Sequence, residues 1–480
     1  MTQPYQPTWR SLRTHQTPQW FRDAKFGIYT HWGIYAVPAF GKNVSWYPYN
    51  MYREGTLQYD HHVLIYGHPS QFGYKDFIPE FTGEKFDADE WAELFETAGA
   101  RFAGPVGEHH DGFAMWDSAL TDWNAARMGP KRDIVGELSA AIRARKMRFM
   151  VAMHHAENWW FYPHWRKHFD TADPRYAGLY GPPHNLDFPD ENTEPGVPAW
   201  EKQDRPTKEF LETWKAKLVE VVEEYSPDYI WFDFGLGLIP EQYRRDFVAY
   251  YYNKGAEWDR GGVVLSYKWD NLPPGTGVVD IELGKMAEQT YYEWITDTTV
   301  DDGQGWGYLK DTPYKSVTEL VHYLVDNVSK NGYLLLNVGP KPNGEIPQEA
   351  RDILVGIGEW LNVNGEAVYG TVPWVQYGEG PTRMTTDGAF SDIKEKTHYT
   401  AQDIRFTVKD NALYAICLGW PTREFTIEAA KRLYPSEVQS VRMLGTDRDL
   451  KWQMTNAGLV IERPGEKPCE HAFGFKIERE

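Results

Sequence analysis

Residues 227–235, with the sequence PDYIWFDFG, decide the fold class. The apolar and aromatic run 229–232 is typical of a buried strand, and Asp233 closes it two residues before a glycine. Similar runs occur at 26–31, 102–107, 147–153, 262–267, 278–282 and 332–338. Between them lie stretches with helical apolar spacing, at 87–98, 136–146 and 208–225. This alternation favours a (β/α)8 barrel over an open doubly wound sheet.

The sequence pattern changes beyond Trp374. Short alternating segments such as DIRFTVKDNALYAICLGW are separated by turn residues, which is typical of an antiparallel β-sandwich. A chain of 480 residues also exceeds what a single core of ordinary size accommodates. We therefore predict a catalytic barrel at residues 1–368 and a C-terminal β-sandwich at 369–480. We expect the second unit to be a stabilising cap rather than an independent lectin.

Charge and composition exclude several classes of partner. The chain has 50 Lys and Arg against 69 Asp and Glu, a net charge of -19 that repels nucleic acids and anionic membranes. With only two cysteines there is no disulfide framework and no zinc-ligand pair of the CxxC type. The aromatic content of 15% supplies flat apolar rings of the kind that sugars contact. Phosphate-binding glycine loops are absent from the sequence, and we expect no cofactor.

The sequence also gives expectations about location and assembly. No apolar run approaches the roughly 20 residues of a membrane span, and the first 20 residues lack the apolar region of a signal peptide. We expect a soluble protein, cytoplasmic as the sequence stands, and periplasmic or secreted if a signal peptide has been removed. Its oligomeric state is not indicated by the sequence.

Two carboxylates are candidates for catalysis. In a (β/α)8 barrel, reactive groups stand where strands end, so Asp233 is placed either to attack a sugar carbon or to cap the following helix. A retaining glycosidase needs a second carboxyl about 5–5.5 Å away, with a pKa high enough to hold a proton. Glu282 ends a later predicted strand and is our choice, with Asp280 and Glu293 as rivals that spacing does not separate.

Histidines follow two of the predicted strands in adjacent pairs. Neighbours on a strand point to opposite sides, so a pair is a poor chelate for one ion, and we predict no metal site. We interpret His31, His109 and one of His154 and His155 as hydrogen-bond partners for sugar hydroxyls. The alternative interpretation is that they are structural histidines of the barrel.

Seven segments, in order over roughly residues 18–374, resemble the α-L-fucosidases of glycoside hydrolase family 29. They are WFRDAKFGIYTHWGIYAVPAF, EHHDGFAMWDS, KRDIVGEL, PDYIWFDFG, ITDTTVDDGQGWGY, VSKNGYLLLNVGPKPNGEIP and IGEWLNVNGEAVYG. The resemblance implies a barrel followed by a β-sandwich, retention of configuration, no cofactor, and release of terminal α-linked L-fucose from a glycoside or oligosaccharide.

The resemblance also implies roles for individual residues. Asp233 matches the family's nucleophile, and Glu282 lies about a dozen residues before Trp294, where the family often has its acid/base. The sugar pocket of the family maps to His31, Trp46, His109, His110, Trp231 and Trp306, and His154 is a further pocket candidate.

Two departures from the family pattern leave the exact sugar open. Ser45 precedes the pocket residue Trp46 where many members have Glu, and Ile295 stands where others have Glu or Gln. One alternative is therefore the same chemistry on a related sugar such as an α-L-galactoside. Another is a barrel that binds carbohydrate without catalysis, which two intact carboxyls at Asp233 and Glu282 argue against.

Overall fold

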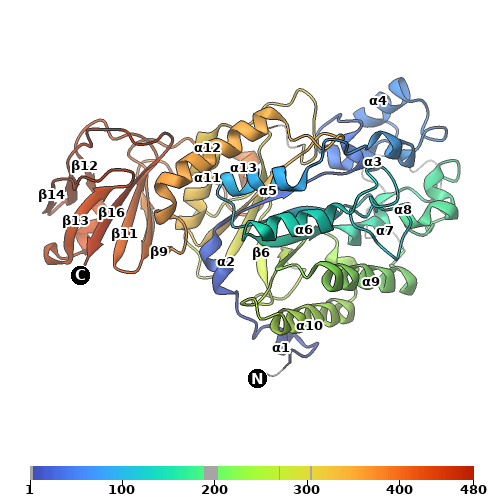
Figure 1. Cartoon of the computed structure of the whole chain (residues 1–480), viewed down its shortest axis with the longest axis horizontal. Coiled ribbons are helices and arrows are strands. Elements are labelled where there is room, and N and C mark those ends of the chain that lie inside the picture. The colour runs from blue at the N-terminus through green and yellow to red at the C-terminus, as the bar shows by residue number, and fades with distance from the viewer. Residues whose placement is uncertain (1–3, 189–203, 270, 303–304) are drawn as a thin grey trace.

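The computed structural model describes residues 4–188, 204–269, 271–302 and 305–480. Eight strands of the described chain form a closed barrel (Figure 1). The strands pair in parallel and in sequence order, and β1 closes the ring by pairing with β8. Their bounds are β1 Phe26–Thr30, β2 Phe102–Glu108, β3 Arg148–Met153, β4 Tyr229–Phe232, β5 Val264–Lys268, β6 Val278–Asp280, β7 Trp294–Thr299 and β8 Gly332–Val338. The barrel is confirmed, and all seven predicted strands are among these eight.

Barrel strands are apolar on both faces because each face is covered. Along β1, Tyr29 points into an inner cluster with Trp231 and Leu335, whereas Ile28 belongs to the outer core. Parallel strands covered on both sides have near-continuous apolar sequences rather than strict alternation. This double burial explains why the strands were visible as short apolar runs.

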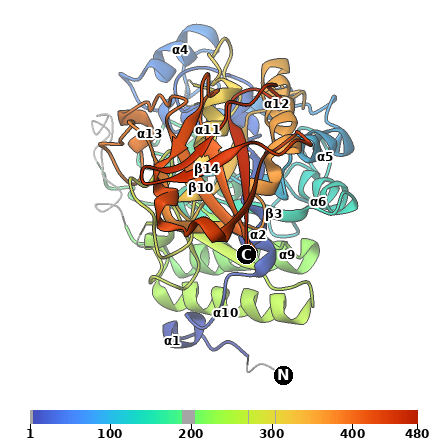
Figure 2. The same cartoon turned by 90° about the vertical axis from the view of Figure 1, so that its left-hand side faces the viewer.

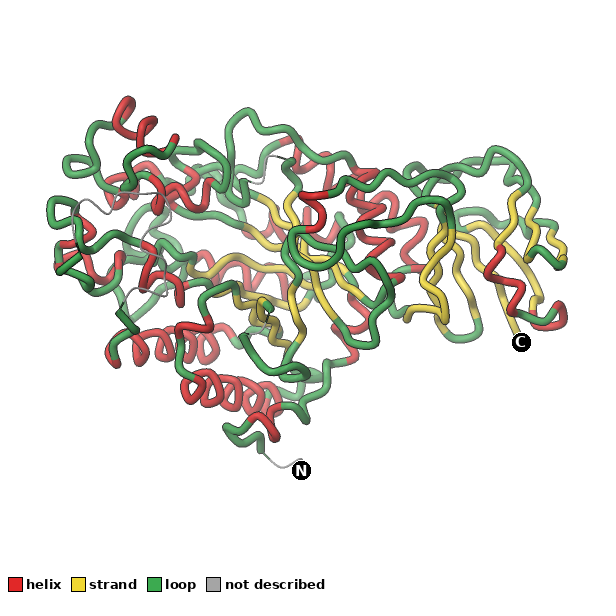
Figure 3. Tube along the Cα trace, turned by 180° about the vertical axis from the view of Figure 1, so that it is seen from behind, coloured by secondary structure: helices red, strands yellow, loops and turns green. Residues whose placement is uncertain are grey.

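Helices surround most of the barrel (Figures 1 and 3). Side-chain caps satisfy free N–H groups at several helix starts, as Thr207 does for α9 and the capping box of Ser316 and Glu319 does for α11. The longer helices are α4 Leu57–Ile65, α5 Ala88–Thr97, α6 Ile134–Ala144, α9 Lys208–Tyr225, α10 Glu241–Glu257, α11 Val317–Ser329 and α12 Gln348–Asn364. The short ones are α1 Trp9–Leu12, α2 Gln19–Ala24, α3 Tyr47–Asn50, α7 Asn158–Phe161, α8 Ala177–Tyr180 and α13 Ser391–Lys394.

The helical ring is incomplete beside β6. Within the described residues no helix separates β5 from β6 or β6 from β7. A helical crossover between parallel strands needs a dozen or more residues, and the β5–β6 connection runs only from Lys268 to Val278. The fold is therefore a (β/α)8-like barrel that lacks two of its helices in the described chain.

The C-terminal part consists of antiparallel sheets packed beside α11 and α12 (Figure 2). It has its own apolar core, which includes Phe406, Val441 and Phe475. A five-stranded sheet has the order β13-β16-β11-β10-β9 and a three-stranded sheet the order β12-β15-β14. Their bounds are β9 Val372–Glu379, β10 Ile404–Lys409, β11 Ala412–Cys417, β12 Phe425–Ile427, β13 Val438–Met443, β14 Trp452–Thr455, β15 Gly458–Ile461 and β16 Phe473–Arg479. The predicted antiparallel fold of this part is confirmed.

A buried ion pair joins the two parts. Asp326 on α11 accepts hydrogen bonds from Lys330, at 2.8 Å, and from Arg405 on β10, at 2.6 Å. Both cysteines, Cys417 and Cys469, are unpaired thiols. Among the helices of the described residues, none has the length and apolar character needed to cross a membrane.

Candidate active site

A pocket of about 220 Å³ opens at the carboxyl ends of the barrel strands. It collects the side chains that follow strands far apart in the sequence, because parallel strands of a barrel end at one face. The lining includes Tyr29, His31, Asn43, Ser45, Trp46, His109, His154, Trp231, Asp233, Phe234, Glu282, Leu283, Asp297, Trp306, Phe390 and Ile393. Both proposed catalytic carboxyls are therefore present in one cavity.

Asp233 directly follows β4 and is held ionised. Its Oδ2 atom lies 3.3 Å from Nε2 of His110 and 3.7 Å from Nε2 of His154. Burial raises the pKa of this carboxyl, but the hydrogen bond from His110 and the charge of Lys268 outweigh it and lower the pKa to about 2. A carboxylate without a proton at neutral pH is what a nucleophile requires.

Glu282 has the opposite electrostatic setting. Burial raises its pKa to about 8, against the attraction of Lys268 and with the help of the negative charges of Asp297 and Asp233. Its Oε2 atom lies 3.2 Å from Nζ of Lys268. Two carboxyls whose pKa values are driven apart in one pocket are the combination that an acid and a nucleophile require.

Lys268 ends β5, and its ammonium group contacts several acidic side chains beneath the pocket. The side chain is fully buried, and its ammonium group lies 2.8 Å from Asp280 and 2.9 Å from Asp297. Asp280 also accepts a 2.9 Å hydrogen bond from the indole N–H of Trp231, while Asp297 accepts one from the hydroxyl of Tyr29. The surrounding carboxylates outweigh the cost of burial and raise the pKa of Lys268. This lysine is therefore a permanent cation beneath the pocket.

The structure distinguishes the three carboxyls that the sequence left as candidates for the acid/base. Asp280 is fully buried among Lys268 and Trp231, beneath the pocket. Glu293 precedes β7, at the opposite ends of the strands from Asp233, where it pairs with Arg22 at 2.8 Å and lines a separate hollow. Of the three, Glu282 is the one that lines the pocket with Asp233.

Three histidines meet at the pocket wall from three different strands. Ring centroids lie 5.5 Å apart for His31 and His109, and 4.7 Å apart for His109 and His154. Burial lowers the pKa of all three, and to about 4 for His31. Neutral imidazoles both donate and accept hydrogen bonds, which suits them to sugar hydroxyls.

The tautomer of His31 follows from its neighbour Asn337. The amide Nδ2 of Asn337 donates to the backbone carbonyl of Trp306, so the amide oxygen faces His31. This oxygen accepts from the Nδ1 atom of His31 at 2.8 Å. Nδ1 therefore carries the proton, and Nε2 keeps a free lone pair.

His110 is the member of the histidine group whose pKa is raised. Its Nδ1 atom donates to the carbonyl of His154 at 3.0 Å, and its Nε2 atom lies 3.3 Å from both Asp233 and Glu157. Burial opposes a positive charge here, but Glu157 and Asp233 outweigh it and raise the pKa of His110. His155, the other candidate of the second pair, turns away and contacts the carbonyl of Trp214.

Aromatic side chains complete the walls. Trp46 lies at the end of a short turn and packs edge-on against His110, with ring centroids 5.4 Å apart. Trp231 packs against His154, and Trp306 packs against His31. All six pocket positions named by the resemblance lie in or against this one cavity.

Several residues that line the pocket or lie beneath it were not predicted from the sequence. Lys268 closes an apolar run, GGVVLSYK, and meets the same criterion that singled out Asp233. Asp297 lies within β7, the strand that was missed. Phe390 and Ile393 come from the C-terminal part, so the expectation that this part is only a stabilising cap is incomplete.

Comparison with known proteins agrees with this geometry. The family model described as alpha-L-fucosidase matches residues 1–366, and that of the alpha-L-fucosidase C-terminal domain matches residues 396–478. Human tissue alpha-L-fucosidase is 32% identical over 98% of this chain and 91% of its own length. The chain belongs to the α-L-fucosidases of glycoside hydrolase family 29.

Solved structures of this fucosidase family match along the whole chain. The alpha-fucosidase of Thermotoga maritima, in complex with a mechanism based inhibitor, superposes with a TM-score of 0.77 and 31% identity, covering 99% of this chain and 100% of its own. A GH29 alpha-L-fucosidase of Bacteroides thetaiotaomicron, at 19% identity and a TM-score of 0.68, shares the fold over 97% of this chain and 96% of its own.

Departures from the fucosidase pattern fall in two different places. Ser45 lines the pocket beside Trp46. Ile295 is fully buried on β7 in the inner cluster of the barrel. Of the two, Ser45 is the departure that lines the pocket.

Proposed function

We propose that the protein hydrolyses terminal α-linked L-fucose with retention of configuration, using Asp233 as nucleophile and Glu282 as acid/base. The observation that carries this proposal is that the two carboxyls line one pocket with pKa values of about 2 and about 8. At neutral pH one is ionised and the other holds its proton. Double displacement needs this division of roles.

In the first step, the Asp233 carboxylate attacks the anomeric carbon while Glu282 gives its proton to the glycosidic oxygen. The bond between sugar and leaving group breaks, and an ester joins fucose to Asp233. In the second step, ionised Glu282 takes a proton from water, the hydroxide attacks the anomeric carbon, and Asp233 leaves as carboxylate. Two inversions at one carbon give overall retention.

Charge groups around the pair support both steps. The imidazolium of His110, 3.3 Å from Asp233, stabilises this carboxylate before attack and again when it leaves. Lys268 lies 3.2 Å from Glu282 and stabilises the ionised form that acts as base. The charges are fixed by burial and need no rearrangement during turnover.

Sugar recognition falls to the neutral histidines and the indoles. We assign His31, His109 and His154 to the sugar hydroxyls and Trp46, Trp231 and Trp306 to the apolar faces of the ring. A site built to pair hydroxyls penalises a missing or misplaced one. The substrate is then a fucosylated glycoside or oligosaccharide, bound in a barrel unit that we place at residues 1–368.

An α-L-galactoside is the second candidate, since it differs from the fucoside at the methyl group alone. The observation that favours it is Ser45, a buried hydroxyl in the pocket lining where many fucosidases have Glu.

Initial rates on p-nitrophenyl α-L-fucoside, α-L-galactoside, β-D-fucoside and β-D-galactoside test the proposal, with the product anomer followed by proton NMR. We expect the α-L-fucoside to be cleaved fastest and to release the α-anomer first. Release of the β-anomer would contradict retention, and a faster α-L-galactoside would reassign the sugar. Sugar binding without any hydrolysis, unchanged in Asp233→Ala, would support a non-catalytic barrel.

A further inference from the structure

A segment of the C-terminal part lies directly on the loop that carries Glu282. The backbone N–H of Phe390 donates to the carbonyl of Glu282 at 2.7 Å, and that of Asp392 donates to the carbonyl of Leu283 at 2.9 Å. The N–H of Gly388 adds a third bond, to the carbonyl of Lys285 at 2.9 Å. About a hundred residues separate the partners of each bond. The segment is therefore held against the Glu282 loop by tertiary contacts.

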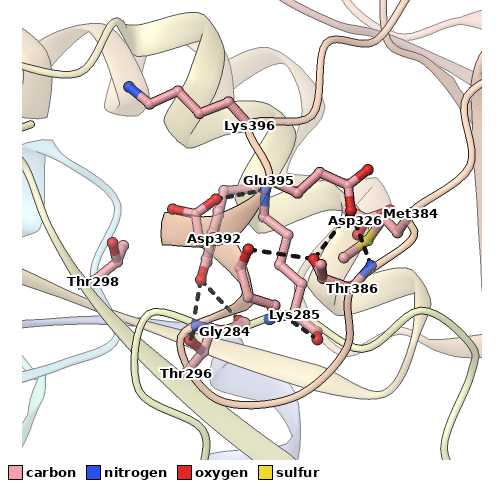
Figure 4. A network of polar contacts seen from close by, with 12 residues as sticks. Gly284, Lys285, Thr296, Thr298, Asp326, Met384, Thr386, Asp392, Glu395 and Lys396 are labelled. Atoms are coloured by element: carbon pink, nitrogen blue, oxygen red, sulfur yellow. Dashed lines mark hydrogen bonds and ion pairs between the residues drawn. The ribbon is translucent and has the colours of Figure 1, made fainter.

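Side chains fix the same segment in place (Figure 4). Nζ of Lys285 pairs with Asp392 at 2.9 Å, and the N–H of Lys285 donates to the hydroxyl of Ser391 at 2.9 Å. Glu395 closes the segment on itself by accepting hydrogen bonds from Thr385 and Thr386. The position of Phe390 is therefore determined by contacts on both sides of it.

Phe390 belongs to a group of three neighbouring aromatic residues, of which Phe234 and Phe390 line the pocket and Trp269 lies beside it. Its backbone has a φ of +59°, a conformation that non-glycine residues seldom adopt, and its side chain lines the cavity. Trp269 lies 4.6 Å from Phe234 and 6.2 Å from Phe390, measured between ring centroids. Phe234 also lines the pocket, and Trp269 is 50% exposed. A large indole left half in water beside a pocket offers a flat face to a ligand.

The proposed role of Glu282 places the leaving group on the same side of the pocket as Phe390. Glu282 must reach the glycosidic oxygen, so the group attached to that oxygen leaves beside Glu282 and beside the residue bonded to its backbone. We propose that Phe234, Trp269 and Phe390 form the site for the leaving group and select a six-membered ring that presents an apolar face, either a pyranose or an aryl ring. The inference rests on the proposed function and adds to it a wall supplied by the C-terminal part.

The test compares leaving groups with and without a ring. The substrates are α-L-fucosyl fluoride, p-nitrophenyl α-L-fucoside and a disaccharide of fucose linked to galactose. For Phe390→Ala, which keeps the backbone bond to Glu282, we expect kcat/KM to fall about five- to tenfold more on the two ring-bearing substrates than on the fluoride. Trp269→Ala should give the same difference, and it alters a half-exposed side chain rather than a core one. A drop on the aryl fucoside alone assigns the site to aryl rings. A drop on the disaccharide alone overturns the inference, because a displaced Glu282 slows only the leaving group that needs its proton.

The control is Tyr434→Ala, which removes an exposed aromatic ring of the C-terminal part at 72% exposure and should leave all three rates unchanged. Equal losses on fluoride and ring substrates in both variants would overturn the inference, since the variants then disturb the fucose-binding part of the pocket that all three substrates share. A wild-type protein that does not cleave the fluoride would instead refute the proposed function, and this inference with it.

Discussion

Nζ of Lys268 lies 3.2 Å from Oε2 of Glu282, and the same ammonium group contacts Asp280 and Asp297. Removing this cation should raise the pKa of Glu282 and of Asp233, because Lys268 lowers both. It also leaves the buried carboxyls of Asp280 and Asp297 without their cation, which typically costs about 3–5 kcal/mol of folding free energy. We expect Lys268→Met to lose activity more than about tenfold and to unfold at lower denaturant concentration. Lys268→Arg, which keeps the charge, is the matched control, and a Met variant with wild-type stability would contradict this role.

The pKa of Glu282, about 8, predicts the alkaline limb of activity. The first step needs protonated Glu282, so kcat/KM should be level below this pH and fall about tenfold per pH unit above it. The measurement is the pH dependence of kcat/KM on the aryl fucoside. Glu282→Gln should lose this limb while retaining slow cleavage of activated leaving groups. A limb that persists in Glu282→Gln would assign the titration to another residue.

Glu157 should hold the proton on His110. The two side chains are buried 3.3 Å apart, and Glu157 is the largest influence that raises the pKa of His110 against burial. In Glu157→Gln the imidazolium should deprotonate at lower pH, so that Asp233 loses its charged donor and activity near neutral pH falls about tenfold. Glu157→Asp restores the charge and should recover part of the loss. A pH profile that matches the wild type in Glu157→Gln would show that Glu157 only fills space.

Asp326 should be essential for docking of the C-terminal part. The carboxylate is fully buried, and Lys330 and Arg405 lower its pKa by outweighing the effect of burial. Because Asp326→Ala leaves Arg405 buried without its partner, we expect a loss of about 3–5 kcal/mol in denaturant unfolding. Asp449→Ala, which breaks an exposed ion pair with Arg442, should change stability by less than about 0.5 kcal/mol. Similar values for the two variants would contradict the docking role.

The sequence predicted the barrel because its strands are buried on both faces and therefore appear as apolar runs. The strand β7 was missed for a physical reason. Its sequence WITDTT places Asp297 inside the barrel, where Lys268 neutralises it, so the strand lacks a continuous apolar run. Burial of a charged residue depends on a partner from another strand, which a local pattern does not show.

The residues of the site were predicted only where a local sequence pattern marks them. Asp233 and His31 close apolar runs and were found from their position, and Glu282 was found by the same criterion with two rivals left open. Phe390 reaches the pocket through hydrogen bonds to residues about a hundred positions away, and it has no local signal. Contacts of this kind depend on how the C-terminal part docks, and the sequence pattern carries no information about that.

The most direct test of the central claim is chemical rescue of Asp233→Ala by sodium azide. The variant should fold as the wild type does and be inactive on p-nitrophenyl α-L-fucoside. Azide can enter the space vacated by the carboxylate and attack the same face of the sugar, so we predict renewed nitrophenol release and β-L-fucosyl azide as the product by proton NMR. Near-normal hydrolysis by Asp233→Ala without azide, or an α-azide product, would contradict the role of Asp233 as nucleophile.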